Sequence, residues 1–123
     1  MLKKLLHTRY RVNDLEKTVA FYRDVLGLTQ TRTSKSGRGS ELVFFKAPGS
    51  DEEIEICRYP ASGPVTMGPD VTHLAFSVDD LDAFEAHIKS KGYAFSDGPH
   101  GTKPHRMAFV DGPEGYEFEI IER

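Results

Sequence analysis

The chain has 123 residues, of which 38% are hydrophobic and 28% are charged, so a compact unit that buries roughly two thirds of its unfolded surface is expected. The formal net charge of -3 gives no indication of a nucleic-acid or anionic-membrane partner, and no apolar run approaches the length of a membrane span. Cys57 is the only cysteine, which excludes an internal disulfide and favours a reducing cytoplasm.

The first half of the chain predicts a strand, a helix and two further strands. Residues 5–12 alternate between polar and apolar side chains, which is typical of a strand. Asp14 is placed to cap a helix that ends at Gly27, and residues 41–45 and 52–59 predict two strands. The apolar stripe of this predicted helix consists of Leu15, Val19, Tyr22 and Leu26.

The second half predicts the same order of elements. Residues 72–78 alternate as a strand does, and Asp80 is placed to cap a helix that ends at Gly92. Residues 106–110 and 116–122 predict two further strands. The apolar stripe of the second predicted helix consists of Leu81, Phe84 and Ile88.

The two halves form an internal repeat. The pattern His-x-x-x-x-Val-[Asn/Asp]-Asp-Leu occurs at residues 7–15 and again at residues 73–81. The offset between equivalent residues falls from 66 for the two histidines to 64 for Glu55 and Glu119. This decrease of two predicts two single-residue deletions in the second half relative to the first, both placed in loops.

The repeat and the composition of its middle predict the domain organisation. Residues 60–70 are rich in Pro and Gly and indicate a linker. The expected fold is α+β, built from two βαβββ modules, with module one at about residues 1–60 and module two at about residues 71–123. Together they form a single domain over residues 1–123.

Each module carries one His and one Glu on the strand face opposite its helix, because side chains alternate along a strand. If the repeat brings these two faces together, four side chains converge. Two imidazoles and two carboxylates suit a divalent metal of borderline hardness. A single His or Glu in a strand is more often a core or solvated residue, but here both recur at equivalent positions. The expected metal ligands are His7, Glu55, His73 and Glu119.

Four stretches of the sequence carry a resemblance to a known family. They lie at residues 5–33, 53–59, 73–80 and 107–122, and include "FYRDVLGL" and "MAFVDGPEGYEFEIIE". Nearly the whole chain thus resembles the vicinal oxygen chelate superfamily and, within it, glyoxalase I (lactoylglutathione lyase). The resemblance implies paired βαβββ modules that form a metal-centred cleft. It also implies isomerisation of the methylglyoxal–glutathione hemithioacetal to S-lactoylglutathione through an enediolate, which detoxifies methylglyoxal.

The resemblance also implies roles for individual residues. Glu119 matches the carboxylate that usually acts as the base. The equivalent position of Glu55 in the first module makes it the expected pseudo-symmetric catalytic partner. Arg11 matches the residue that holds the γ-glutamyl carboxylate of glutathione, and Tyr59 stands where the family often has Asn. The usual basic residues before the last strands are not in clear register. Lys103 and Arg106 are the available substitutes for substrate binding.

Cofactor and partners follow from the same resemblance. One divalent metal ion is expected per active site. Ni²⁺ or Co²⁺ is favoured over Zn²⁺, because the short chain without Trp looks more like the nickel- or cobalt-activated members. The expected substrate is the glutathione hemithioacetal, and the expected assembly is a cytoplasmic homodimer without nucleic-acid or membrane partners.

Several other functions stay open from the sequence. The protein could be another vicinal oxygen chelate enzyme, namely an epimerase, an extradiol dioxygenase or a thiol transferase. These relatives tend to have a different or smaller ligand set, and Glu55 counts against them. A non-catalytic small-molecule binding protein is the alternative from a different class. Cys57 shares a strand face with Glu55, and a small apolar filler is the favoured interpretation of this thiol.

Overall fold

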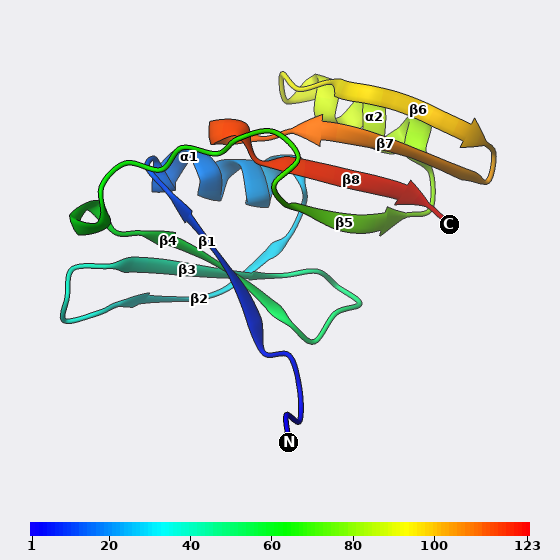
Figure 1. Ribbon diagram of the computed structural model, residues 1–123. Coiled ribbons are helices and arrows are strands. Elements are labelled where there is room, and N and C mark those ends of the chain that lie inside the picture. The colour runs from blue at the N-terminus through cyan, green and yellow to red at the C-terminus, as the bar shows by residue number, and fades with distance from the viewer. The chain divides into compact units, whose positions relative to one another are not determined.

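The computed structural model describes residues 1–123 as two compact units, Met1–Val65 and Thr66–Arg123. Each unit is a four-stranded sheet with one helical segment between its first two strands (Figure 1). No helix of the structure is long and apolar enough to cross a membrane. The α+β class and the two repeated βαβββ modules predicted from the sequence are therefore confirmed.

Unit 1 has the strand order β1-β4-β3-β2, in which β1 runs parallel to β4 and the other neighbours are antiparallel. The helix α1 continues directly into a π-helical turn, η1, and a short 3₁₀ turn, η2, follows β4. The elements are β1 (His7–Val12), α1 (Leu15–Ala20), η1 (Phe21–Val25), β2 (Thr29–Lys35), β3 (Glu41–Lys46), β4 (Glu53–Arg58) and η2 (Pro60–Ser62).

Unit 2 repeats this topology with the order β5-β8-β7-β6, and β5 runs parallel to β8. Figure 1 shows β8, in red, between β5 and β7. The elements are β5 (His73–Val78), α2 (Leu81–Ser90), β6 (Phe95–Thr102), β7 (His105–Asp111), η3 (Pro113–Gly115) and β8 (Glu117–Glu122). The sequence predicted the two helices and every strand except the residues of β2 and β6, and it did not predict the π turn or the 3₁₀ turns.

Both helices begin and end where the sequence predicts. The Asp14 carboxylate accepts a hydrogen bond from the backbone N–H of Lys17 at 3.0 Å, and Asp80 caps α2 in the same way. These side chains satisfy N–H groups that have no partner within the helix. After the helices, Gly27 and Gly92 adopt φ values of 72° and 86°, a left-handed conformation that favours glycine.

The π-helical turn corrects one detail of the repeat. The offset between the units is 66 at the two N-caps, Asp14 and Asp80, but 65 at Gly27 and Gly92. One residue is therefore added inside the first helix, and Phe21–Val25 absorb it as a π turn. The prediction that both length differences lie in loops was wrong for this one. The second difference lies between Pro48 and Glu55, in the connection before β4.

The buried side of the first helix differs from the predicted stripe. The predicted stripe was Leu15, Val19, Tyr22 and Leu26, and of these Tyr22 alone is fully buried. The buried residues keep the three-to-four-residue spacing of a helix, but they form a stripe displaced by about one residue from the predicted one. The residues buried along this segment are Thr18, Phe21, Tyr22 and Val25.

Strand alternation separates an apolar core face from a polar face in each unit. On β4, Ile54 and Ile56 lie in the core beneath α1, while Glu55 projects to the opposite side. On β8, Phe118 and Ile120 are the buried counterparts. The polar faces, which carry the histidines and glutamates, are the surfaces on which a site is expected.

Candidate functional site

The polar face of unit 1 brings His7 and Glu55 together. Because β1 and β4 are parallel neighbours, with Arg9 directly opposite Glu55, the side chains of His7 and Glu55 meet across the strands. His7 Nε2 lies 3.1 Å from Glu55 Oε2, and Arg9 Nη2 donates a hydrogen bond to Glu55 Oε1 at 2.9 Å. The edge of the His7 ring packs against Phe44 with 5.9 Å between ring centroids.

The polar face of unit 2 repeats this arrangement. His73 Nε2 lies 3.1 Å from Glu119 Oε1, and the His73 ring packs edge-on against Phe109 at 5.4 Å. Glu119 is paired in register with Ala75, the counterpart of Arg9. Each unit therefore presents one imidazole nitrogen and one carboxylate oxygen at the same separation and in the same strand positions.

The two glutamates differ in their exposure to solvent. The Glu55 side chain is 2% exposed, whereas that of Glu119 is 21% exposed. In unit 1, Arg9 contacts the Glu55 carboxylate, and the Arg32 guanidinium stacks 3.7 Å from the centroid of the Phe44 ring. Ala75 and Asp97 occupy the equivalent register positions of unit 2 and provide no such cover.

Two ion pairs of unit 1 shift the pKa of one of their members. The hydrogen bond to Glu55 raises the pKa of Arg9 above its ordinary value. Hydrogen bonds from Arg32 and Thr31 lower the pKa of Glu53, which lies on the same face of β4 as Glu55. Arg9 therefore stays charged, and Glu53 stays ionised.

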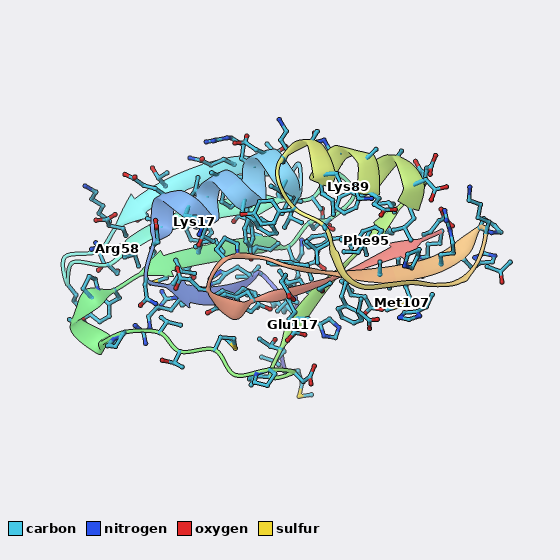
Figure 2. All side chains as sticks on the ribbon, turned by 90° about the horizontal axis from the view of Figure 1, so that it is seen from above. Lys17, Arg58, Lys89, Phe95, Met107 and Glu117 are labelled. Atoms are coloured by element: carbon cyan, nitrogen blue, oxygen red, sulfur yellow. The ribbon has the colours of Figure 1, made fainter.

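The predicted substrate-binding residues Arg11 and Tyr59 lie together at the C-terminal ends of β1 and β4. With Arg58, labelled in Figure 2, they line a hollow of about 200 Å³. Arg11 Nη1 donates a hydrogen bond to the carbonyl oxygen of Gly63 at 2.6 Å, which orients its guanidinium at the wall of this hollow. The hollow combines positive charge with an aromatic ring, which suits a ligand with a carboxylate.

The other two predicted substrate-binding residues, Lys103 and Arg106, lie elsewhere. Arg106 stands next to Met107 on β7 and therefore faces the opposite side of the sheet from Glu119. It donates hydrogen bonds to Glu122 and Asp82, and Lys103 lies 2.7 Å from Asp82. These ion pairs hold Lys103 and Arg106 at the start of α2, away from the His73–Glu119 pair.

A second hollow, of about 400 Å³, lies beside His73 in unit 2. Its polar lining is acidic, in contrast to the hollow of unit 1, and Glu117 in Figure 2 marks its position at the start of β8. Phe109 supplies an apolar wall. The lining residues are Asp70, His73, Ser96, Asp97, Phe109, Asp111 and Glu117.

Cys57 lies on the same face of β4 as Glu55 and is completely buried. Burial raises the pKa of its thiol, because the charged thiolate is disfavoured away from water. This environment agrees with the expected role of an apolar filler rather than a nucleophile.

Arg9 is the functional candidate that the sequence interpretation missed. Period two placed it on the face of His7, but the signal that singles it out is the register of the parallel pair β1–β4. That register sets Arg9 directly opposite Glu55. The corresponding Ala75 opposite Glu119 shows that this contact is absent from the second copy of the repeat.

Comparison with known proteins decides the family. A model of the Glyoxalase/Bleomycin resistance protein/Dioxygenase superfamily matches residues 4–120. The chain belongs to this superfamily. The resemblance to the vicinal oxygen chelate proteins is thus confirmed.

Individual members of the superfamily are similar over nearly the whole chain. A probable lactoylglutathione lyase of Synechocystis is 34% identical, covering 96% of this chain and 94% of its own. A lactoylglutathione lyase of Salmonella typhimurium is 34% identical, covering 97% and 92%. Glyoxalase I of Zea mays has a TM-score of 0.84 at 28% identity, and covers 98% of this chain and 44% of the maize chain. These relatives imply a divalent metal ion as cofactor.

The donor atoms of each unit fit such an ion. Metal–nitrogen and metal–oxygen bonds of roughly 2.1 Å at a right angle place two donor atoms about 3 Å apart. The 3.1 Å separations of the His7–Glu55 and His73–Glu119 pairs match this spacing. No group of three or more His, Cys, Asp or Glu side chains converges in the structure. Each unit therefore brings two potential donor atoms together.

Proposed function

We propose that this protein isomerises the hemithioacetal of methylglyoxal and glutathione to S-lactoylglutathione. The observation that carries the proposal is the His–Glu pair, which recurs with the same 3.1 Å separation on the polar face of both units. A binding protein that merely encloses a ligand has no need of two matched imidazole–carboxylate pairs. The relatives named lactoylglutathione lyase support the same reaction.

The proposed cofactor is one divalent metal ion held by both pairs. His7 and Glu55 supply two ligands, and His73 and Glu119 supply two more. This mixed nitrogen and oxygen set suits Ni²⁺ or Co²⁺, with Zn²⁺ as the alternative. When bound, the ion supplies Lewis-acid chemistry to two neighbouring oxygens of the substrate.

The proposed base is Glu119. Its carboxylate takes the proton from the carbon next to the substrate carbonyl and returns it to the neighbouring carbon, so no redox cofactor is needed. Arg11 and Tyr59 bind the carboxylate of the glutathione moiety in their hollow. The proposed substrate-binding set narrows to these two residues, because Asp82 engages both Lys103 and Arg106.

The proposed assembly is a cytoplasmic homodimer in which unit 1 of one chain pairs with unit 2 of the other. Charge supports this pairing. The polar face of unit 1 carries Arg9 and Arg32, whereas the equivalent residues of unit 2 are Ala75 and Asp97. Arg9 and Arg32 neutralise Glu55 and Glu53, so the acidic face of unit 2 is repelled less by unit 1 than by a second unit 2, which favours the pairing of unlike units. Sedimentation at twice the chain mass of 13.8 kDa is expected, and a fully active monomer would contradict the dimer.

One experiment tests the function and separates it from the alternatives. The protein is purified without added metal, its metal content is measured, and isomerisation of methylglyoxal plus glutathione is followed. About one divalent ion per site, with turnover lost on chelation and restored by Ni²⁺ or Co²⁺, is expected. The variant His73→Ala loses most of its metal, while Arg23→Ala, a change of an exposed helix residue, keeps it. Bound metal without turnover would indicate another enzyme of the superfamily. Absence of both metal and turnover would indicate a binding protein.

A further inference from the structure

We propose that Arg9 is a positioning residue that holds one carboxylate oxygen of Glu55, so that Glu55 offers a metal ion a single fixed oxygen. The inference rests on the proposed metal site and adds a residue that distinguishes its two carboxylates. Glu55 then serves as a permanent ligand, and the movement needed for proton transfer is left to Glu119.

The contacts of Glu55 give each of its two oxygens a separate partner. Oε2 lies 3.1 Å from His7 Nε2, the neighbouring proposed ligand, and Oε1 accepts the hydrogen bond from Arg9 Nη2 at 2.9 Å. A metal ion beside His7 therefore meets Oε2 first. Binding through both oxygens requires the Arg9 hydrogen bond to break. A hydrogen bond between two charged groups is among the stronger contacts in proteins, which favours the arrangement with one oxygen on the metal.

Burial adds to this restraint. The Glu55 side chain is 2% exposed, and it lies in the middle of β4, where both neighbouring strands pair with it. A carboxylate in such a place moves away from its partners only if they move too. Arg9 is anchored on β1 in direct register with Glu55, so the pair is held by the backbone of two adjacent strands.

Unit 2 provides an internal comparison. Ala75 occupies the register position of Arg9, and its methyl group donates no hydrogen bond to Glu119. The hydrogen-bond partner of Glu119 is His73, through Oε1, and the side chain is 21% exposed. Its second oxygen has no guanidinium to hold it. Glu119 is thus the carboxylate that is able to leave the metal and reach a substrate carbon.

The first test observes the Arg9 guanidinium directly. Nitrogen-15 NMR of the side-chain guanidinium groups is recorded while Zn²⁺, a diamagnetic probe, is added to the purified protein. Arg9→Lys identifies the Arg9 signals, and those of Arg23, which pairs with Asp24 on its own helix, serve as the control. The Arg9 signals are expected to stay restrained at zinc saturation.

The outcomes of this test separate the two proposals. Zinc binding accompanied by release of Arg9, with signals like those of a free arginine, would overturn the role of Arg9 and leave the metal site standing. Failure to bind zinc would overturn the metal site and the inference together.

The second test removes the Arg9 hydrogen bond that restrains Glu55 and measures the effect on the Glu119→Gln variant. In the native background, Glu119→Gln is expected to lower kcat at least ~10²-fold, the effect typical of a lost general base. In the Arg9→Ala background, Glu55 is no longer held and is free to move as Glu119 does. Glu119→Gln is then expected to lower kcat only about tenfold or less. Arg9→Lys, which keeps a cationic donor, restores the larger loss. An equal loss in all three backgrounds, each with metal bound, would overturn the inference.

The reciprocal variant is Ala75→Arg, which places a guanidinium opposite the half-buried Glu119. It is expected to lower kcat about tenfold or more while metal content stays unchanged, because Glu119 becomes held as Glu55 is. Native turnover in this variant would show that restraint of the carboxylate has no effect on proton transfer. Such a result would also overturn the inference.

Discussion

In unit 1, β3 and β4 carry an ion pair between Glu41 and Arg58, whereas in unit 2 the equivalent positions of β7 and β8 carry Arg106 and Glu122. The charges are reversed, and the surroundings differ as much. Glu41 and Arg58 are 41% and 42% exposed and lie 3.5 Å apart. Arg106 and Glu122 are 11% and 4% exposed and lie 2.7 Å apart. The same two backbone positions thus carry an exposed pair in one unit and a buried pair in the other.

The reversal has a physical consequence for the helices. Glu122 accepts the backbone N–H of Leu81 at 2.8 Å, so it helps Asp80 to cap α2. Arg58 has donor groups alone and cannot act in this way for α1. Instead it lines the hollow that contains Arg11 and Tyr59. A repeat position that stabilises a helix in unit 2 therefore contributes to a candidate ligand site in unit 1.

A second contrast lies on the polar faces. Both units position a His and a Glu in the same way, but only unit 1 adds an arginine to the carboxylate. The backbone and register of the module are sufficient to bring the His and Glu side chains together. The neighbouring residue, Arg9 or Ala75, then decides how tightly each carboxylate is held.

The largest expected effect tests whether the carboxylates of Glu119 and Glu55 have different roles. Glu119→Gln should lower kcat for hemithioacetal isomerisation at least ~10²-fold and keep most of the metal, because the amide oxygen still coordinates. Glu55→Gln should alter metal affinity more than Glu119→Gln does, because the amide leaves Arg9 without its anionic partner. The measurements are kcat and metal content of both variants. Near-native turnover of metal-loaded Glu119→Gln would show that another group is the base.

The next effect sharpens the contrast between the two ion pairs. Glu122→Gln should lower the thermal midpoint strongly, because the nearly buried Arg106 then loses the carboxylate that accepts two of its hydrogen bonds and keeps only the exposed Asp82 as an anionic partner. The matched change Glu41→Gln, in the exposed pair, should alter the free energy of unfolding by no more than about 0.5 kcal/mol. Thermal unfolding followed by circular dichroism compares the two. Equal losses would mean that burial does not distinguish the pairs.

The smallest effect is a dependence of stability on pH. Hydrogen bonds from Arg106 and the Leu81 N–H lower the pKa of Glu122 to about 2. Since the unfolded chain binds this proton near its ordinary pKa of about 4.3, the folded state is favoured above that pH and loses the advantage as pH falls toward 2. Thermal midpoints between pH 7 and pH 2 should therefore fall less steeply in Glu122→Gln than in the native protein. Identical slopes would contradict the assignment.

The sequence by itself determined most of the architecture and the identity of the paired side chains. Alternation along residues 5–12 and 72–78 and the caps at Asp14 and Asp80 are local features, and the 66-residue offset shows that they recur. They depend on strand and helix geometry, which is the same wherever the elements end up. For this reason the His–Glu pairs were predictable once the repeat was recognised.

Tertiary structure decided what depends on register and packing. The π turn at Phe21–Val25 accommodates an added residue within a packed helix, which the apolar period does not show. The contact of Arg9 with Glu55 and the capture of Arg106 by Glu122 depend on which residues stand opposite each other on neighbouring strands. A charged side chain pairs with an opposite charge that lies close to it in space. Strand pairing, rather than position along the chain, determines which residue that is.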